Sequence, residues 1–161
     1  FKGGNLLDIQ IAADPSADPK RKTPVPGDAR ILVTRQQGKP AVVIYRPKVK
    51  DFKGQPIVLT SPANKESFDA IEPTDKVGLQ YTKTQAGFSA VVTIPLEVLG
   101  WTPKAGENVK LDFGYIFGNA TGGEASLRAY WTNTGFSAGV LHDIPNEARL
   151  EPGEWGTATV E

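Results

Sequence analysis

Short runs of alternating apolar and polar residues, most of them ended by glycine or proline, recur along this chain of 161 residues. The clearest run is 109–117, where Val, Leu, Phe, Tyr and Phe occupy every second position. A period of two residues is that of a β-strand, and the breaks come too often for long helices. The pattern predicts an all-β fold, an antiparallel β-sandwich of jelly-roll type with almost no helix.

Eight to ten strands are expected from these runs. Their ranges are 6–11, 29–35, 41–45, 57–59, 67–71, 77–82, 88–94, 109–117, 126–131 and 155–160. In the first, apolar Leu7 and Ile9 alternate with polar Asp8 and Gln10, which predicts a half-buried strand. Residues 96–99 are the only helical candidate, one turn long. The chain shows no internal repeat, and its length suits a single domain over 1–161.

The composition excludes several classes of function. Lys and Arg number 18 and Asp and Glu also number 18, so there is no basic excess of the kind that nucleic-acid-binding domains show. The one dense basic run, 20–22, is bracketed by acidic residues and is better explained as a solvated loop than as a phosphate site. Cysteine is absent, which excludes disulfides and thiolate nucleophiles. No apolar run reaches the length of a membrane-spanning helix.

Catalytic motifs are also missing from the sequence. It contains no G-x-S-x-G, no H-E-x-x-H and no phosphate-binding loop. The single histidine, His142, can be combined with Ser and Asp residues of the sequence, but a catalytic triad is defined by the distances between its side chains. The sequence alone does not give those distances. The carboxylate pair Glu147 and Glu151 has the spacing of an ordinary surface pattern. We therefore predict that the protein is not an enzyme.

Three segments resemble the family 9 carbohydrate-binding modules and their DOMON-like relatives, and together they cover about half of the chain. The first is residues 4–11, GNLLDIQI, and the last is residues 155–160, WGTATV. The second lies in 93–133, where the matching positions are Ile94, Pro95, Leu99, Gly100, Gly106, Asp112, Phe113, Asn119, Arg128 and Trp131. The loop 14–28 and the segment 145–148 are similar to an environmental-bacterial subgroup that occurs inside larger secreted proteins.

The resemblance implies a non-catalytic carbohydrate-binding module of a larger secreted bacterial protein, located in the periplasm or outside the cell. The chain begins at Phe1 and has no methionine and no visible signal peptide, which indicates a processed or excised piece. Family members usually have one or two further strands before the segment that opens this chain. Those strands are either removed or carried by another segment. The alternative function is therefore a structural or interaction domain that completes its sandwich with another part of the parent protein.

Sugar binding requires an aromatic face against the pyranose ring and polar side chains around it. The aromatic candidates are Trp101, Trp131, Tyr81 and Phe136, and their polar partners are Asn119, Arg128 and Asn133. Trp101 is the best single candidate, because it follows a turn and precedes a proline, although it could also cover one end of the core. Trp131 and Trp155 are better explained as structural residues. The segment 133–154 offers only Phe136 for the second half of the family's tryptophan clamp.

The resemblance also implies a structural calcium ion. Asp14, Asp18 and Asp28 fall in one polar loop, with Asn5 and Asp8 on the strand that leads into it. No Asp-x-Asp-x-Asp spacing is present, so these residues are better explained as turn caps than as calcium ligands. DOMON-like relatives bind heme through methionine and histidine or lysine. Without any methionine and with one histidine, this chain is not expected to bind heme.

Overall fold

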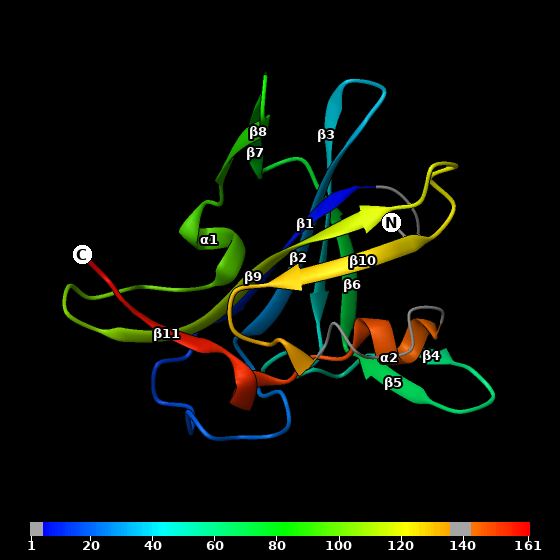
Figure 1. Ribbon diagram of the computed structural model, residues 1–161. Coiled ribbons are helices and arrows are strands. Elements are labelled where there is room, and N and C mark those ends of the chain that lie inside the picture. Colours follow the sequence, from blue (N-terminus) through cyan, green and yellow to red (C-terminus); the bar gives the residue numbers. More distant parts are fainter. Residues whose placement is uncertain (1–4, 136–142) are drawn as a thin grey trace.

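The computed structural model describes residues 5–135 and 143–161, and it is built mostly from antiparallel β-strands (Figure 1). It confirms the predicted all-β, sandwich-like fold. Eleven strands lie in the described ranges, one more than the largest number expected. Phe136 and His142 fall outside these ranges. None of the helices described is both long and apolar enough to cross a membrane.

A seven-stranded sheet forms the centre of the fold. Its strand order is β10 (Ala125–Tyr130), β9 (Asn108–Gly118), β1 (Leu6–Ala12), β2 (Asp28–Gln36), β3 (Lys39–Arg46) and β6 (Ala70–Thr74), with β11 (Gly156–Thr159) also on β9. Leu111 pairs with both β1 and β11, and Tyr115 pairs with both β1 and β10. Strands β10 and β11 therefore follow one another along the edge of β9 that faces away from β1.

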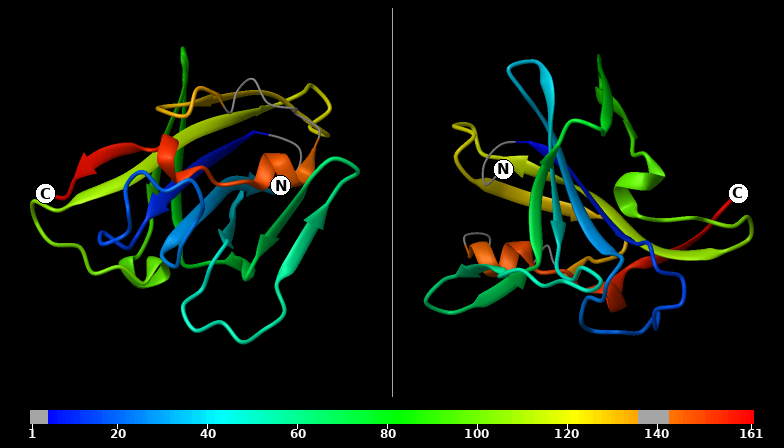
Figure 2. Two further views of the ribbon diagram at one scale, coloured as in Figure 1. Left: turned by 90° about the horizontal axis from the view of Figure 1, so that it is seen from below. Right: turned by 180° about the vertical axis from the view of Figure 1, so that it is seen from behind.

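Two hairpins and three short helical segments pack around this sheet. They are β4 (Ile57–Thr60), β5 (Lys65–Phe68), β7 (Gly78–Thr84), β8 (Gly87–Thr93), α1 (Leu96–Leu99), α2 (Ile144–Ala148) and the 3₁₀ turn η2 (Pro152–Glu154). The β7–β8 hairpin and α1 lie on one side of the sheet, whereas β4–β5 and α2 lie on the other (Figures 1 and 2).

One face of the sheet carries the main apolar core. Ile9, Ile31 and Ile44 are cross-strand neighbours on β1, β2 and β3, so their side chains share a face. Leu79 from β7 and Val92 from β8 pack against this cluster, together with residues of α1. The hairpin thus supplies the second layer of the sandwich over the middle of the sheet.

The opposite face of β1 is buried more deeply than this one, which the half-buried interpretation of the strand did not anticipate. Asp8 is 0% exposed and Gln10 is 3% exposed. The carboxylate of Asp8 accepts hydrogen bonds from Arg30 on β2, with the shortest at 2.6 Å, and from the Tyr130 hydroxyl at 2.5 Å. Gln10 accepts a hydrogen bond from the Trp155 indole at 3.0 Å. Polar side chains are tolerated in this layer because each has a partner.

The sequence interpretation was wrong at two further places. The single strand expected at 67–71 is divided at Asp69, whose carboxylate accepts the amide of Val49 at 2.8 Å. Strand β5 therefore pairs with β4, whereas β6 pairs with β3. Helix α2 was also not expected, although Asp143 caps its first turn by accepting the Asn146 amide at 3.3 Å.

Candidate functional site

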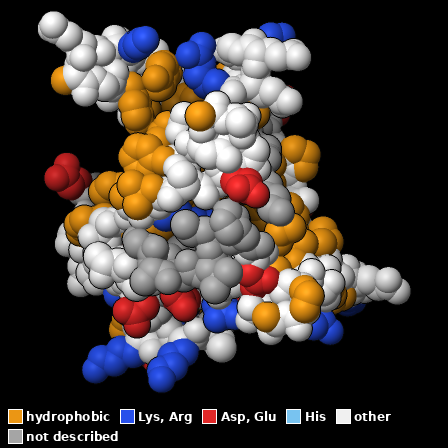
Figure 3. Space-filling view, turned by 45° about the vertical axis from the view of Figure 1, so that its right-hand side comes forward, with side chains coloured by type: hydrophobic (Ala, Val, Ile, Leu, Met, Phe, Trp, Pro, Cys, Tyr) orange, Lys and Arg blue, Asp and Glu red, His pale blue; other side chains and the backbone are white. Residues whose placement is uncertain are grey.

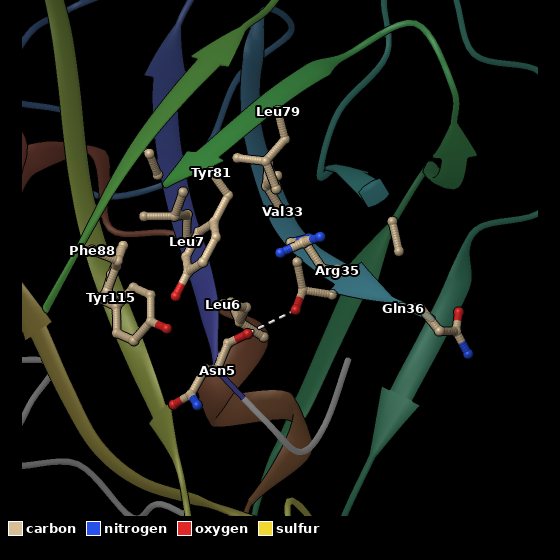
Figure 4. A pocket seen from close by; sticks show the side chains of 13 residues that line it. Asn5, Leu6, Leu7, Val33, Arg35, Gln36, Leu79, Tyr81, Phe88 and Tyr115 are labelled. Atoms are coloured by element: carbon tan, nitrogen blue, oxygen red, sulfur yellow. Dashed lines mark hydrogen bonds between the residues drawn. The ribbon is translucent and has the colours of Figure 1, made fainter. Parts of the chain in front are cut away.

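A cleft of about 670 Å³ opens between the β7–β8 hairpin and the ends of β1 and β2 (Figure 4). Leu7, Val33 and Leu79 form its apolar floor. Leu6, Ala41 and Ala90 add to the apolar lining. The aromatic and polar lining residues come from four different strands and the residue before β1. They are Tyr81, Phe88, Tyr115, Asn5, Thr34, Arg35 and Gln36.

Aromatic rings form a continuous row along one wall of the cleft. Tyr81 and Phe88 stack with their ring centroids 5.4 Å apart and their planes inclined by 21°. Phe88 contacts Tyr115 at 5.0 Å, and Tyr115 contacts Phe117 edge-on at 4.7 Å. Tyr81 is 41% exposed and Phe88 is 39% exposed. The row therefore presents apolar ring surface directly to solvent.

Polar groups surround these rings at the rim. The guanidinium of Arg35 lies 5.2 Å from the centroid of the Tyr81 ring, in cation–π geometry, and donates to the Gly38 carbonyl at 3.1 Å. The Thr34 hydroxyl donates to the backbone carbonyl of Asn5 at 2.7 Å. The side-chain oxygen of Asn5 accepts the Gly118 amide at 3.0 Å. These bonds fix the rim residues in place and leave the amide nitrogen of Asn5 available as a donor.

The two tyrosines supply further hydrogen-bonding groups. Their hydroxyls point toward one another in Figure 4. Burial, and in second place the neighbouring Tyr81, raises the pKa of Tyr115 above its ordinary value. The Tyr115 hydroxyl therefore keeps its proton at neutral pH and can donate a hydrogen bond to a ligand.

The aromatic surface continues beyond the cleft onto the outer strands. Phe113, Phe117, Leu127 and Trp131 are between 39% and 52% exposed, and register places the first three on the face that carries the core. Hydrophobic side chains are exposed along one side of the molecule in Figure 3. Alternation over 109–117 places Phe113 and Phe117 on one face of β9, and the structure leaves both side chains exposed there. The physical reason is that the β7–β8 layer covers only the middle of the sheet.

The structure separates the aromatic residues that were predicted to bind sugar. Tyr81 lines the cleft. Trp131 stacks on Phe113 with centroids 5.5 Å apart and lies over Gly156, where a Cβ atom would come within 2.5 Å of the ring. Trp101 is half-buried against the core cluster and does not line the cleft. Of the predicted aromatic candidates that the structure describes, Tyr81 alone lines the cleft.

The predicted polar partners lie elsewhere and have structural contacts. Asn119 organises the β9–β10 turn, where its side chain accepts the Gly123 amide at 3.0 Å. Arg128 is 4% exposed and forms an ion pair with Glu147 at 2.8 Å. Asn133 is 5% exposed and donates to Glu151 at 3.0 Å.

The four predicted calcium ligands are engaged with other groups. Asp8 is bound by Arg30, and Asp28 pairs with Arg21 while accepting the Val25 amide at 2.9 Å. Each arginine already neutralises the charge that a cation would need.

Asp14 and Asp18 cap turns. Asp14 accepts hydrogen bonds from the side chain and backbone of Ser16, which lower its pKa, and Asp18 accepts the Lys20 amide at 2.9 Å. Within 5–135 and 143–161, no three His, Asp or Glu side chains gather to hold a metal. The calcium site therefore stays a prediction of the resemblance, and the residues named for it do not fit the ion as they are arranged.

Sequence reasoning missed Asn5, Arg35, Phe88 and Tyr115 as members of a binding site. Phe88 and Tyr115 were assigned to core-facing strand positions, because alternation alone does not tell where a covering layer ends. The available signal was the position of Phe88 beside the tight turn at 85–87, since side chains at hairpin ends commonly extend past the sheet that they cover.

Comparison of the chain with protein-family models, with curated proteins and with solved structures found no match. The fold and the cleft thus define an all-β domain that exposes aromatic side chains beside an open cleft.

Proposed function

We propose that this protein is a non-catalytic carbohydrate-binding module that holds a sugar in the cleft against the ring of Tyr81. The observation that carries the proposal is the row of Tyr81, Phe88 and Tyr115, whose rings contact one another beside a solvent-filled cleft with a polar rim. The family resemblance of the sequence supports the same function.

The chemistry of the cleft suits a pyranose. One face of such a ring carries C–H groups, which pack favourably on an aromatic face, whereas its edge carries hydroxyls that need hydrogen-bond partners. Tyr81 supplies the aromatic face once the exposed guanidinium of Arg35, which lies over this ring, moves aside. Asn5, Gln36 and the Tyr115 hydroxyl lie at the edges of the same cleft, where they can replace the water molecules bound to the sugar.

We place the module in a larger secreted bacterial protein, in the periplasm or outside the cell. Carbohydrate polymers are found in those compartments, and the absence of cysteine is compatible with them. A module of this kind would keep its parent protein close to a glycan.

Isothermal titration calorimetry with a panel of soluble oligosaccharides tests this function. We expect saturable binding by the wild type and a loss of at least about tenfold in affinity for Tyr81→Ala, because the stacking face is removed. Phe113→Ala is the matched control, since this ring is 52% exposed on the same sheet face but does not line the cleft. No binding to any sugar, or equal loss in both variants, would reject the cleft as the sugar site.

A second function is favoured by a separate observation, the apolar face of β9 and β10. Phe113, Phe117 and Leu127 are exposed there, and no strand in the described part of the chain pairs with the outer edge of β10. We propose as the alternative that this surface receives another segment or domain of the parent protein, which completes the sandwich.

Hydrogen exchange distinguishes this alternative from sugar binding. If another segment covers β10, the amides of 125–130 exchange more slowly in the parent protein than in this domain alone. The amides of the β4–β5 hairpin, on the other side of the sheet, serve as the internal control. Equal exchange of 125–130 in both proteins would reject the alternative without affecting the cleft.

A further inference from the structure

We infer that the cleft selects acidic sugars, and that Arg35 binds the carboxylate of a uronic acid unit whose ring stacks on Tyr81. This inference rests on the proposed carbohydrate-binding function and specifies the class of ligand. Its basis is the charge distribution around the cleft.

Arg35 is the only charged side chain among the described residues that line the cleft. It is exposed, and no carboxylate within 5–135 or 143–161 forms an ion pair with it. Its one hydrogen bond within the described part of the chain, to the Gly38 carbonyl, occupies a single N–H group of the five that a guanidinium carries. The remaining donors are available to a ligand.

The strands around the cleft expose positive charge but no carboxylate. Their acidic residues, Asp8 on β1, Asp28 on β2 and Asp112 on β9, are buried, and Asp8 and Asp28 are paired with arginines. The segments 29–50 and 76–96 contain no Asp or Glu, although the whole chain has as many acidic as basic residues. Lys39 is the cross-strand partner of Gln36, a lining residue, and Lys83 is the cross-strand partner of Phe88. The segment 113–123 of β9 and its following turn has no charged residue at all. The cleft is therefore an electropositive site in a protein of zero formal net charge.

The position of Arg35 matches the geometry of a uronic acid. In such a sugar the carboxylate is attached to the edge of the pyranose ring, so it lies beside the face that stacks on an aromatic residue. The guanidinium of Arg35 lies over the ring of Tyr81, with its centre 5.2 Å from the ring centroid, and Phe88 stacks on the same ring. A sugar that stacks on Tyr81 therefore takes the place of the guanidinium, whose exposed side chain moves to the edge of the sugar. A planar guanidinium binds a carboxylate through two parallel hydrogen bonds, which a neutral sugar hydroxyl cannot accept in the same way.

A pair of ligands with the same carbon skeleton provides the test. Calorimetry compares trigalacturonate with its fully methyl-esterified form, in which every carboxylate is neutral, alongside the panel of neutral oligosaccharides. We expect the wild type to bind trigalacturonate at least about tenfold more tightly than the ester. The preference should shrink when sodium chloride is raised from about 50 to about 500 mM, because the cleft is open to solvent and salt screens the charge.

Three variants assign the effect to one side chain. Arg35→Gln should abolish the preference for trigalacturonate over its ester, and Arg35→Lys should retain part of that preference. Lys65→Gln removes one positive charge from the β4–β5 hairpin and should change neither the affinity for trigalacturonate nor that for its ester. Circular dichroism melts establish that the variants are folded.

The outcomes separate this inference from the proposed function. Equal affinity of the wild type for acid and ester, or an unchanged preference in Arg35→Gln, overturns the role of Arg35 while sugar binding stands. Binding of neutral oligosaccharides without binding of trigalacturonate would also overturn the role of Arg35 and leave sugar binding in place. If no sugar of either kind binds, both the inference and the proposed function are rejected.

Discussion

Phe88 on β8 contacts Tyr115 on β9, with ring centroids 5.0 Å apart, although the two strands belong to different layers of the fold. This contact joins the covering hairpin to strand β9 of the central sheet. It also closes one wall of the cleft, because both rings line it. The shape of the cleft therefore depends on how the hairpin is held against β9.

Replacing Phe88 by alanine should affect both stability and binding. The variant loses its contacts with Tyr81 and Tyr115, so we expect the free energy of unfolding to fall by about 1 to 2 kcal/mol. Sugar affinity should fall as well, because the wall of the cleft is no longer fixed. Urea unfolding and calorimetric titration measure the two effects.

The matched control for Phe88 is Val91→Ala, at a residue of the same strand that is 53% exposed and does not line the cleft. This change should alter neither quantity measurably. If Phe88→Ala behaved like Val91→Ala, the contact between the layers would have no energetic role.

The buried ion pair between Asp8 and Arg30 provides a second prediction. Asp8→Ala leaves the guanidinium of Arg30 in a site where its side chain is 3% exposed, without its carboxylate partner. We expect a loss of about 3 to 5 kcal/mol in the free energy of unfolding, measured by urea titration. Glu97→Gln is the control, because its pair with Lys76 lies at the surface and should contribute almost nothing. Similar losses in the two variants would contradict the importance of burial.

The sequence predicts the local features of this fold better than the contacts between residues that are distant in the chain. Alternation located the strands well, because the two-residue period is a local property of the backbone. It did not report that the polar face of β1 is its more deeply buried face, since the partner of Asp8 is 22 positions away at Arg30. Pairing between such distant residues follows from strand register, which a single sequence does not specify.

The sequence predicted the aromatic character of the candidate site, but it identified only some of the residues that form it. Tyr81 was among the aromatic residues expected to bind sugar, and it lines the cleft. Trp101 was preferred because it follows a turn, yet it packs against the core. Exposure of a ring depends on where the second layer ends, and the β7–β8 hairpin is shorter than the sheet beneath it. That boundary is a tertiary property, so Phe88 and Tyr115 could not be separated from core residues.

Alkaline pH should destabilise the protein through its buried tyrosines. Burial is the main cause that raises the pKa of Tyr45, Tyr115 and Tyr130 in the folded state. The unfolded chain releases these protons near pH 10, whereas the folded protein retains them to higher pH. The folded state then binds more protons, so the free energy of unfolding falls as pH rises above about 10.

Tyr130→Phe tests this dependence, because Tyr130 has the most strongly raised pKa of the three and donates to Asp8. The variant should lose about 2 kcal/mol at neutral pH, since the hydrogen bond to a carboxylate is removed. Its stability should also decline less steeply above pH 10 than that of the wild type, as followed by urea titrations across pH. An equally steep decline would assign the alkaline loss to other groups.

Calcium binding is implied by the resemblance of the sequence to the family 9 modules, and it can be measured directly. If the ion bound the folded state, excess calcium would raise the melting temperature, and a chelator would reverse the change. We expect no such shift through Asp8 and Asp28, because Arg30 and Arg21 already occupy their carboxylates. Differential scanning calorimetry with calcium and with EDTA measures it. A calcium-dependent rise that is lost in Asp14→Asn would instead establish the ion in the 14–28 loop, and would require Arg21 to leave Asp28.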